Sequence, residues 1–253
     1  MHAGAKLGQH FLRDEDVLAR MASAAVAPDD TVVEVGPGRG ALTRHLLQIA
    51  RQVLAVELDA GLAEDLPRRC GDPQGLTVIA ADILQVSLPD ILSESSPGRA
   101  VVVGNLPYYI TSPILRKVLA ARHEFRSATF LMQEEVADRV VASGGSRSFG
   151  FLSCFCQLQS SPEKLFRVPP DAFEPPPAVH SAVVRFDIAG EPPAAGLLAF
   201  LSACFRHPRK MLKNNLAAHY PPPRLNADPC AGMRAQQLSL SELREMWERL
   251  EGP

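Results

Sequence analysis

The segment Asn105-Leu106-Pro107-Tyr108 follows a short apolar run and combines residue types that could activate an aromatic amine. The amino group of adenine is a poor nucleophile, because its lone pair is delocalised into the ring. The Asn105 oxygen and a backbone carbonyl of the Leu106-Pro107 turn could accept its protons and aim the lone pair at an electrophile. Tyr108 could stack on the base and hold it outside its helix. The competing interpretation is a strand exit with a proline turn and a tyrosine packed on the core.

Acidic residues lie where three successive predicted strands end. Glu34 precedes the glycine-rich loop 36–40, whose glycines would let a ligand approach the backbone closely. Glu57 could bind the two hydroxyls of a ribose, and Asp82 could accept a proton from an adenine amino group. The loop does not fit the dinucleotide fingerprint G-x-G-x-x-G, because its third glycine comes one residue early. Each acid alone is more often a solvated loop residue, but together they favour a cofactor that contains a nucleoside.

Other catalytic motifs are absent from the sequence. It contains no G-x-S-x-G, Walker loop or H-E-x-x-H motif, and no Ser-His-Asp order. The only close cysteine pair is Cys154 and Cys156, without a second pair or a histidine cluster, so we expect no metal site. A site that orients an aromatic amine, as proposed for Asn105-Leu106-Pro107-Tyr108, needs no strong general base, because positioning and stabilisation of developing charge can account for the rate.

These motifs need a scaffold that brings strand ends together, and the apolar pattern predicts one. Strands are expected at 31–35, 52–56, 76–80, 100–103 and 128–132, and helices at 41–49, 60–69, 111–121 and 134–141. The alternation predicts an α/β fold with a doubly wound parallel sheet, whose ligands bind beyond the carboxyl ends of the strands. Residues 157–167 and 181–188 are expected to add an antiparallel hairpin at the end of the sheet.

The pattern changes after residue 189. Strand signals stop, and helical spacing is found at 197–205, 209–218 and 241–250, with Ser239 or Ser241 as a plausible N-cap of the last helix. We therefore expect two domains, an α/β domain at 1–189 and a small all-α domain at 190–253.

The charge of the chain is unevenly distributed. The 253 residues carry 26 basic and 28 acidic side chains, a formal charge of −2, which argues against a protein that binds nucleic acid with its whole surface. Between Glu191 and Asp228 there is no acid. The basic residues of this stretch that we expect to contact RNA phosphates are Arg206, Arg209, Lys210 and Lys213. The spacing of Arg206, Lys210 and Lys213 predicts one helical face, and a merely solvated face is the alternative.

The sequence also lacks targeting signals. No segment approaches the roughly 18 apolar residues of a membrane span, and the first 30 residues contain no apolar core of signal-peptide length. We expect a cytoplasmic protein without membrane contact.

Taken in order, these motifs resemble those of the S-adenosylmethionine-dependent ribosomal RNA adenine N6-dimethyltransferases. The resemblance covers most of the chain, from about residue 6 to residue 216. The segments that carry it are Gly8–Leu12, Glu34–Gly38, Val56–Asp59, Ala81–Asp82, Asn105–Tyr108 and the Phe-x-Pro-Pro-Pro-x-Val-x-Ser motif at 173–181. The resemblance implies a Rossmann-like methyltransferase domain, a small helical RNA-binding domain and S-adenosylmethionine as the cofactor. Two positions differ from the usual pattern: His10 stands where Asn is more frequent, and Phe149 stands where Tyr is usual.

The resemblance also implies roles for individual residues. The cofactor-binding residues that it implies are His10, Leu12, Gly36, Gly38, Glu57, Asp82 and Asn105. His10 and Leu12 would cover the cofactor, and Gly36 and Gly38 would approach its methionine part. The catalytic residues that it implies are Asn105, Leu106, Pro107, Tyr108 and Phe173. Phe173 is the candidate second wall of the base pocket, although an ordinary core aromatic would fit the same position.

Two branches of this family are compatible with the motifs. One dimethylates two adjacent adenines in a hairpin loop near the 3′ end of 16S rRNA, within a small ribosomal subunit or its precursor. The other modifies one adenine of 23S rRNA and gives macrolide resistance. Leu106 favours the first branch, because the second more often has Ile at this position. We also expect the protein to be a monomer. The alternatives outside these branches are a non-catalytic RNA-binding assembly or transcription factor and a DNA adenine methyltransferase.

Overall fold

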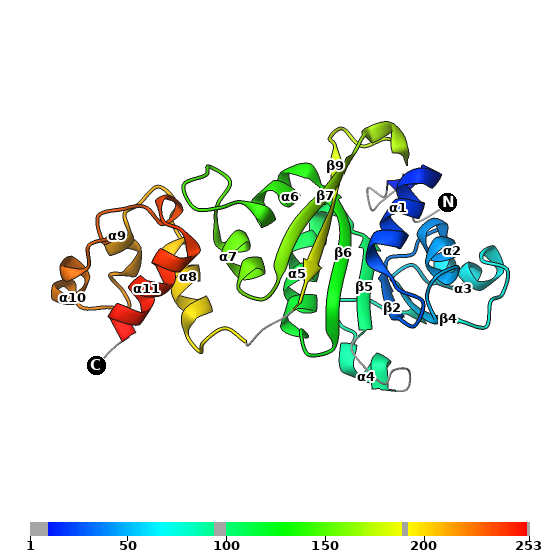
Figure 1. Cartoon of the computed structure of the whole chain (residues 1–253), viewed down its shortest axis with the longest axis horizontal. Coiled ribbons are helices and arrows are strands. Elements are labelled where there is room, and N and C mark those ends of the chain that lie inside the picture. The colour runs from blue at the N-terminus through cyan, green and yellow to red at the C-terminus, as the bar shows by residue number, and fades with distance from the viewer. Residues whose placement is uncertain (1–9, 94–99, 189–191, 252–253) are drawn as a thin grey trace. The chain divides into compact units, whose positions relative to one another are not determined.

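The computed structural model describes residues 10–93, 100–188 and 192–251 (Figure 1). The start of the Gly8–Leu12 motif and the predicted domain boundary at 189–190 lie outside these residues. The chain forms two compact units, one made of 1–137 and 160–189 and the other of 138–159 and 190–253.

The first unit is built around a seven-stranded sheet in the order β4-β3-β2-β5-β6-β9-β7. The strands are β2 (Thr31–Val35), β3 (Gln52–Glu57), β4 (Leu76–Ala80), β5 (Ala100–Asn105), β6 (Phe125–Gln133), β7 (Ser161–Val168) and β9 (Ser181–Asp187). The first five are parallel, and β9 pairs antiparallel with both β6 and β7. Figure 1 shows β6 between β5 and β9. The predicted doubly wound sheet with a terminal antiparallel hairpin is therefore confirmed.

The strand order reverses between β2 and β5, which creates the switch point where such sheets bind ligands. All five residues of β2 are buried, as expected for a central strand packed on both faces. Register places Glu34 beside Ala55 of β3 and Val103 of β5. The carboxyl ends of β2, β3, β4 and β5 thus meet at one edge of the sheet.

Helices separate the parallel strands as predicted. Those of the first two thirds of the chain are α1 (Glu15–Ala25), α2 (Ala41–Leu47), α3 (Ala60–Arg69), α4 (Leu88–Ser93), α5 (Thr111–Ala120), α6 (Glu134–Val141) and α7 (Phe151–Gln157). The strand expected at 157–167 begins only at Ser161, because α7 extends to Gln157. The buried Cys154, Phe155 and Cys156 belong to that helix.

A second, very short sheet was not predicted. Strand β1 (Phe11–Leu12) pairs antiparallel with β8 (Phe173–Glu174), so that Phe11 lies opposite Glu174 and Leu12 opposite Phe173. The amide of Arg13 extends the contact by donating to the carbonyl of Ala172 at 2.9 Å. The pairing fastens the beginning of the chain to the proline-rich loop before β9.

The second unit is helical, as predicted, but it contains more than the C-terminal segment. Its later helices are α8 (Leu197–Cys204), α9 (Leu212–Leu216), α10 (Pro222–Ala227) and α11 (Leu240–Glu251). Phe149 and Cys154 are buried in one apolar cluster with residues of these helices, such as Leu201 and Met246. This shared core explains why residues 138–159 group with 190–253, which the predicted boundary did not anticipate. Ser239 caps α11, because its hydroxyl accepts the Glu242 amide at 3.2 Å.

Candidate active site

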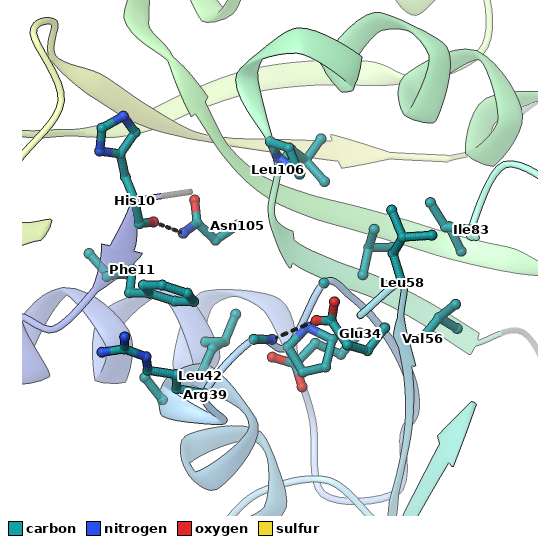
Figure 2. Close-up of a pocket in the computed structure, with 18 of the residues that line it drawn as sticks. His10, Phe11, Glu34, Arg39, Leu42, Val56, Leu58, Ile83, Asn105 and Leu106 are labelled. Carbon is teal, nitrogen blue, oxygen red and sulfur yellow. Dashed lines mark hydrogen bonds between the residues drawn. The ribbon is translucent and has the colours of Figure 1, made fainter. Parts of the chain in front are cut away.

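A pocket of about 290 Å³ opens at the carboxyl edge of β2, β3, β4 and β5, close to the lower limit for small-molecule sites (Figure 2). Its walls come from β1, the glycine-rich loop 36–40, the ends of β3 and β4, and the segment 105–110. Every lining residue belongs to the first unit.

The glycine-rich loop supplies one wall because its backbone is left-handed at its three glycines, Gly36, Gly38 and Gly40. Gly36 and Gly38 have φ values of 67° and 56°, which strongly favour glycine. A Cβ atom on Gly36 would meet no atom within 4 Å, whereas one on Gly38 would lie 3.1 Å from the Phe11 ring. The guanidinium of Arg39 lies over the same Phe11 ring, 4.3 Å from its centre. Strand β1 therefore packs on the loop at Gly38. The loop backbone at Gly36 has open space beside it and is accessible to a ligand.

Glu57 joins the loop to the end of β3. Its carboxylate accepts the Gly38 amide at 2.9 Å and the Asp59 amide at 3.0 Å, and the side chain is buried. These two bonds fix the position of the carboxylate at the pocket wall. Each oxygen keeps a further lone pair for a ligand hydroxyl.

Asp82 lies at the end of β4, and apolar side chains flank it. Its carboxylate accepts the Leu84 amide at 2.9 Å. Figure 2 shows Leu58 and Ile83 together, on the side of the pocket away from Phe11 and Arg39. Leu58 is 55% exposed, unusually open for a large apolar residue, and such a surface suits the flat face of a base.

Asn105 is held at the end of β5 by the start of the chain. Its side-chain nitrogen donates to the carbonyl of His10 at 3.2 Å (Figure 2). Because the nitrogen is used in this way, the oxygen is the atom presented to other groups. The carbonyl of Pro107 already accepts the Ile110 amide at 3.1 Å and the Thr111 hydroxyl at 3.2 Å. The Leu106 carbonyl is therefore the better second acceptor in the turn.

Tyr108 is anchored at both its hydroxyl and its ring. The hydroxyl is 2.7 Å from the Ser181 hydroxyl, and burial raises the pKa of Tyr108, which keeps it protonated. The ring stacks with that of His10, with centroids 5.8 Å apart and an angle of 30° between the planes. Nδ1 of His10 donates to the carbonyl of Pro175 at 2.7 Å. Four distant segments, around His10, Tyr108, Pro175 and Ser181, thus converge on this side of the pocket.

Phe173 occupies a different environment from the one proposed for it. It is 1% exposed, packs in the apolar core with Leu12, and does not line the pocket. Its neighbour Glu174 lines the pocket instead. The structure therefore does not bring Phe173 together with Asn105 and Tyr108.

Glu34 is the most unusual group at the pocket. It is 1% exposed, and neither of its carboxyl oxygens has a hydrogen-bond partner among the described residues. The pKa of Glu34 is raised to about 8 by burial, an effect that the Thr43 hydroxyl opposes and the negative charge of Glu57 supports. A buried acid without a protein partner at a pocket is a candidate binding group for a ligand.

The residues present fit S-adenosylmethionine, the cofactor that the sequence resemblance implies. The open backbone at Gly36 provides a cradle, and Glu57 and Asp82 provide acceptors for the hydroxyls and the amino group of a nucleoside. The unpartnered carboxyl of Glu34 offers an acid for a positively charged group. His10 and Leu12 also line the pocket, at the positions expected of a cover.

Sequence reasoning missed several lining residues, including Phe11, Arg39, Leu58 and Ile83. Leu58 and Ile83 each follow a predicted acidic residue directly, and Arg39 follows Gly38. Adjacency to a predicted polar site was the only available signal, because a single apolar residue has no distinctive pattern.

The predicted helical face of basic residues is wrong. Arg206 and Lys210 lie in turns between α8 and α9, and only Lys213 is helical. The Asn215 side chain holds these turns by donating to the carbonyls of Cys204 at 2.8 Å and His207 at 3.1 Å. The four predicted phosphate-binding residues are nevertheless all exposed on the second unit: Arg206, Arg209, Lys210 and Lys213.

In the ranges 10–93, 100–188 and 192–251, His, Cys, Asp and Glu side chains form no group of three that could hold a metal ion. Within the same ranges, no helix is both long and apolar enough to span a membrane.

Comparison with known proteins adds an independent observation. The family described as "Ribosomal RNA adenine dimethylase" matches residues 2–245, nearly the whole chain. The chain belongs to this family. Its relatives include "Ribosomal RNA small subunit methyltransferase A" of Acidobacterium capsulatum, 41% identical over 97% of this chain and 90% of that protein. The protein of the same name from Bordetella petrii is 42% identical over 97% and 94%.

Solved structures agree with this fold. A dimethyladenosine transferase from Plasmodium falciparum superposes with a TM-score of 0.77 at 23% identity, over 94% of this chain and 96% of that one. The 23S rRNA methyltransferase ErmE superposes with a TM-score of 0.73 at 29% identity, over 95% of this chain and 99% of that one.

Proposed function

We propose that this member of the ribosomal RNA adenine dimethylase family transfers methyl groups from S-adenosylmethionine to adenine N6 in 16S rRNA. The targets are two adjacent adenines in a hairpin loop near the 3′ end, each converted to N6-dimethyladenosine. The observation that carries this proposal is the fixed amide of Asn105, whose nitrogen is bonded to His10 so that its oxygen is available to an amine.

The bound cofactor would supply an electrophilic methyl group, and the protein's residues position the nucleophile. The Asn105 oxygen and the Leu106 carbonyl accept hydrogen bonds from the target amine, which draws the nitrogen lone pair out of the ring, and the proton displaced by each methyl group leaves to water. Tyr108, held by Ser181, stacks on the flipped base. Catalysis of this kind depends on orientation and on stabilisation of the developing positive charge.

The cofactor would lie along the strand ends. Glu57 binds the ribose hydroxyls, and Asp82 accepts from the adenine amino group between Leu58 and Ile83. Gly36 and Gly38 approach the methionine part, under the cover formed by β1.

The choice of 16S over 23S rRNA is supported by the relatives. Proteins named small-subunit methyltransferases are 41–42% identical to this chain over nearly its whole length, whereas ErmE is 29% identical. A non-catalytic assembly factor would have no need for the oriented Asn105, the anchored Tyr108 and the cofactor acids together.

The α/β region, proposed as residues 1–189, is the methyltransferase domain, and residues 190–253 bind RNA together with the segment 138–159 that shares their core. Arg206, Arg209, Lys210 and Lys213 contact phosphates of the small subunit or its precursor. We infer a monomer that acts in the cytoplasm, where ribosomal subunits are assembled.

Incubation of the purified protein with radiolabelled S-adenosylmethionine tests the proposal. The substrates are undermethylated small subunits, undermethylated large subunits and a DNA duplex. We expect label in 16S rRNA only. Label confined to 23S rRNA would assign the resistance reaction instead, and the absence of label from all three would overturn the enzymatic function.

A further inference from the structure

Glu34 is a buried acid that the proposed transfer chemistry does not use. It lies on β2 between Ala55 of β3 and Val103 of β5, and it lines the pocket beside Gly36. Neither carboxyl oxygen has a hydrogen-bond partner within the described part of the chain, and the nearby Thr43 hydroxyl is equally buried and unpartnered. The interior of a sheet, buried between β3 and β5 and without hydrogen bonds to the carboxyl group, is a costly place for a charge.

The surroundings favour a neutral acid while the pocket is empty. Burial, partly offset by the Thr43 hydroxyl and assisted by the negative charge of Glu57, raises the pKa of Glu34 to about 8. At the end of α3, burial raises the pKa of Cys70, which stays a neutral thiol. Arg39 and Arg44 also line the pocket, and Val103, the β5 neighbour of Glu34, is not ionisable. The carboxyl group is therefore mainly protonated at pH 7.

We propose that Glu34 is a proton-coupled counter-ion for the α-ammonium group of the cofactor. In the empty pocket the carboxyl keeps its proton; when the ammonium group enters, Glu34 releases that proton to solvent and pairs as a carboxylate. The inference rests on the proposed function, because it takes S-adenosylmethionine as the ligand. No covalent bond of the cofactor changes, and one proton moves from Glu34 to water.

The position of Glu34 favours the ammonium group as the partner. Glu34 is two residues before Gly36, the open part of the loop proposed to receive the methionine end. A nearby cation stabilises the ionised form of an acid, which lowers its pKa. The methylated and demethylated forms of the cofactor share this ammonium group, so Glu34 contributes equally to binding both. Binding of this uniform kind tightens the complex without accelerating methyl transfer.

Isothermal titration calorimetry at pH 7, in two buffers with different ionisation enthalpies, measures the protons exchanged on binding. The probes are S-adenosylhomocysteine, which has the ammonium group, and 5′-methylthioadenosine, which has the nucleoside and sulfur but no amino-acid part. The proteins are the wild type and Glu34→Gln, which keeps the shape of the side chain but cannot ionise.

For the wild type we expect release of about 0.9 proton with S-adenosylhomocysteine, since an acid with a pKa near 8 is about 90% protonated at pH 7, and none with 5′-methylthioadenosine. Glu34→Gln should release none with either ligand. It should bind S-adenosylhomocysteine at least several-fold more weakly and 5′-methylthioadenosine unchanged. Titration of the ligand's own amino group would give proton uptake, which is opposite in sign and common to both proteins.

Binding of S-adenosylhomocysteine without proton release, or equal release by Glu34→Gln, would overturn the inference and leave the proposed function standing. Release with 5′-methylthioadenosine would also overturn it. Failure of the wild type to bind any of these ligands would instead overturn the proposed function. If circular dichroism shows that Glu34→Gln does not fold, the comparison of the two ligands on the wild type still decides.

Discussion

The side-chain amide of Asn105 donates to the backbone carbonyl of His10 across 95 positions of sequence. His10 in turn stacks on Tyr108 and bonds to the carbonyl of Pro175, so one residue at the start of the chain supports both parts of the target-base site. The contact uses one of the two N–H donors of the amide and fixes which side of the amide carries the nitrogen, so that the oxygen faces the other way as an acceptor. The orientation of the amide proposed to act in catalysis thus depends on the contact with His10.

Asn105→Ala is expected to lower kcat at least 100-fold without unfolding the protein, because it removes the acceptor that orients the amine. Single-turnover methylation of 16S rRNA measures the effect, and circular dichroism checks the fold. Asn226→Ala, at an exposed position of α10, is the matched control and should behave as the wild type. Turnover by Asn105→Ala close to that of the control would show that another group orients the amine.

Tyr108 offers a separation of its ring from its hydroxyl. Tyr108→Ala removes the stacking surface and should lower kcat/KM for RNA by an amount equivalent to about 1–3 kcal/mol. Tyr108→Phe keeps the ring and loses only the bond to Ser181, so it should cost about 1 kcal/mol. Equal losses in the two variants would mean that the hydroxyl, not the ring, is the functional part.

Gly38→Ala tests the contact between the loop and β1. The new methyl group must displace the Phe11 ring at 3.1 Å, and the left-handed backbone adds about 1 kcal/mol of strain. Gly71→Ala has the same kind of backbone, with φ of 82°, but open space around its Cβ. Equilibrium binding should show at least tenfold weaker affinity for S-adenosylhomocysteine in Gly38→Ala and little change in Gly71→Ala. Similar affinities in the two variants would exclude a role for this packing.

Glu34→Gln should change the pH dependence of stability. Because the pKa of Glu34 is raised on folding, the folded state binds the proton more tightly, and wild-type stability falls as pH rises from about 4.5 to about 8. Relative to the wild type, Glu34→Gln should gain up to about 1.4 kcal/mol in free energy of unfolding per pH unit across this range. Urea unfolding at pH 5.5 and pH 8 measures the difference. A constant difference between the two proteins would show that Glu34 is already ionised in the folded state.

Arg206→Ala and Lys210→Ala should each weaken binding of a 16S rRNA fragment and reduce the slope of log affinity against log salt by about 1. Filter binding at several salt concentrations measures both quantities. Arg244→Ala, on the exposed face of α11 where Arg244 pairs with Glu248, should leave the slope unchanged. Equal slopes for all three variants would place the RNA elsewhere.

The sheet could be predicted because its strands are short, mostly apolar runs separated by segments with helical spacing. The strand ends then placed Glu57, Asp82 and Asn105 at one edge, and the pocket confirms that they lie together. The pairing of β1 with β8 could not be predicted, since strands of two residues have no periodicity.

The remaining differences come from tertiary contacts. The helix expected at 209–218 shortens to Leu212–Leu216, and the Leu212 and Lys213 amides donate instead to the carbonyls of Met233 and Ala231. Phe149 and Cys154 follow the α/β pattern in sequence, yet they pack in the core of the second unit. Residues distant in the sequence determine both the shortened helix and the packing of Phe149 and Cys154, and the local sequence does not identify those residues.

Mass spectrometric mapping of 16S rRNA after incubation with S-adenosylmethionine tests the central claim most directly. The predicted product is N6-dimethyladenosine at two adjacent positions in a 3′-end hairpin loop with the wild type, and none with Asn105→Ala. Methylation at a different atom or outside such a loop, or the same product from Asn105→Ala, would contradict this account.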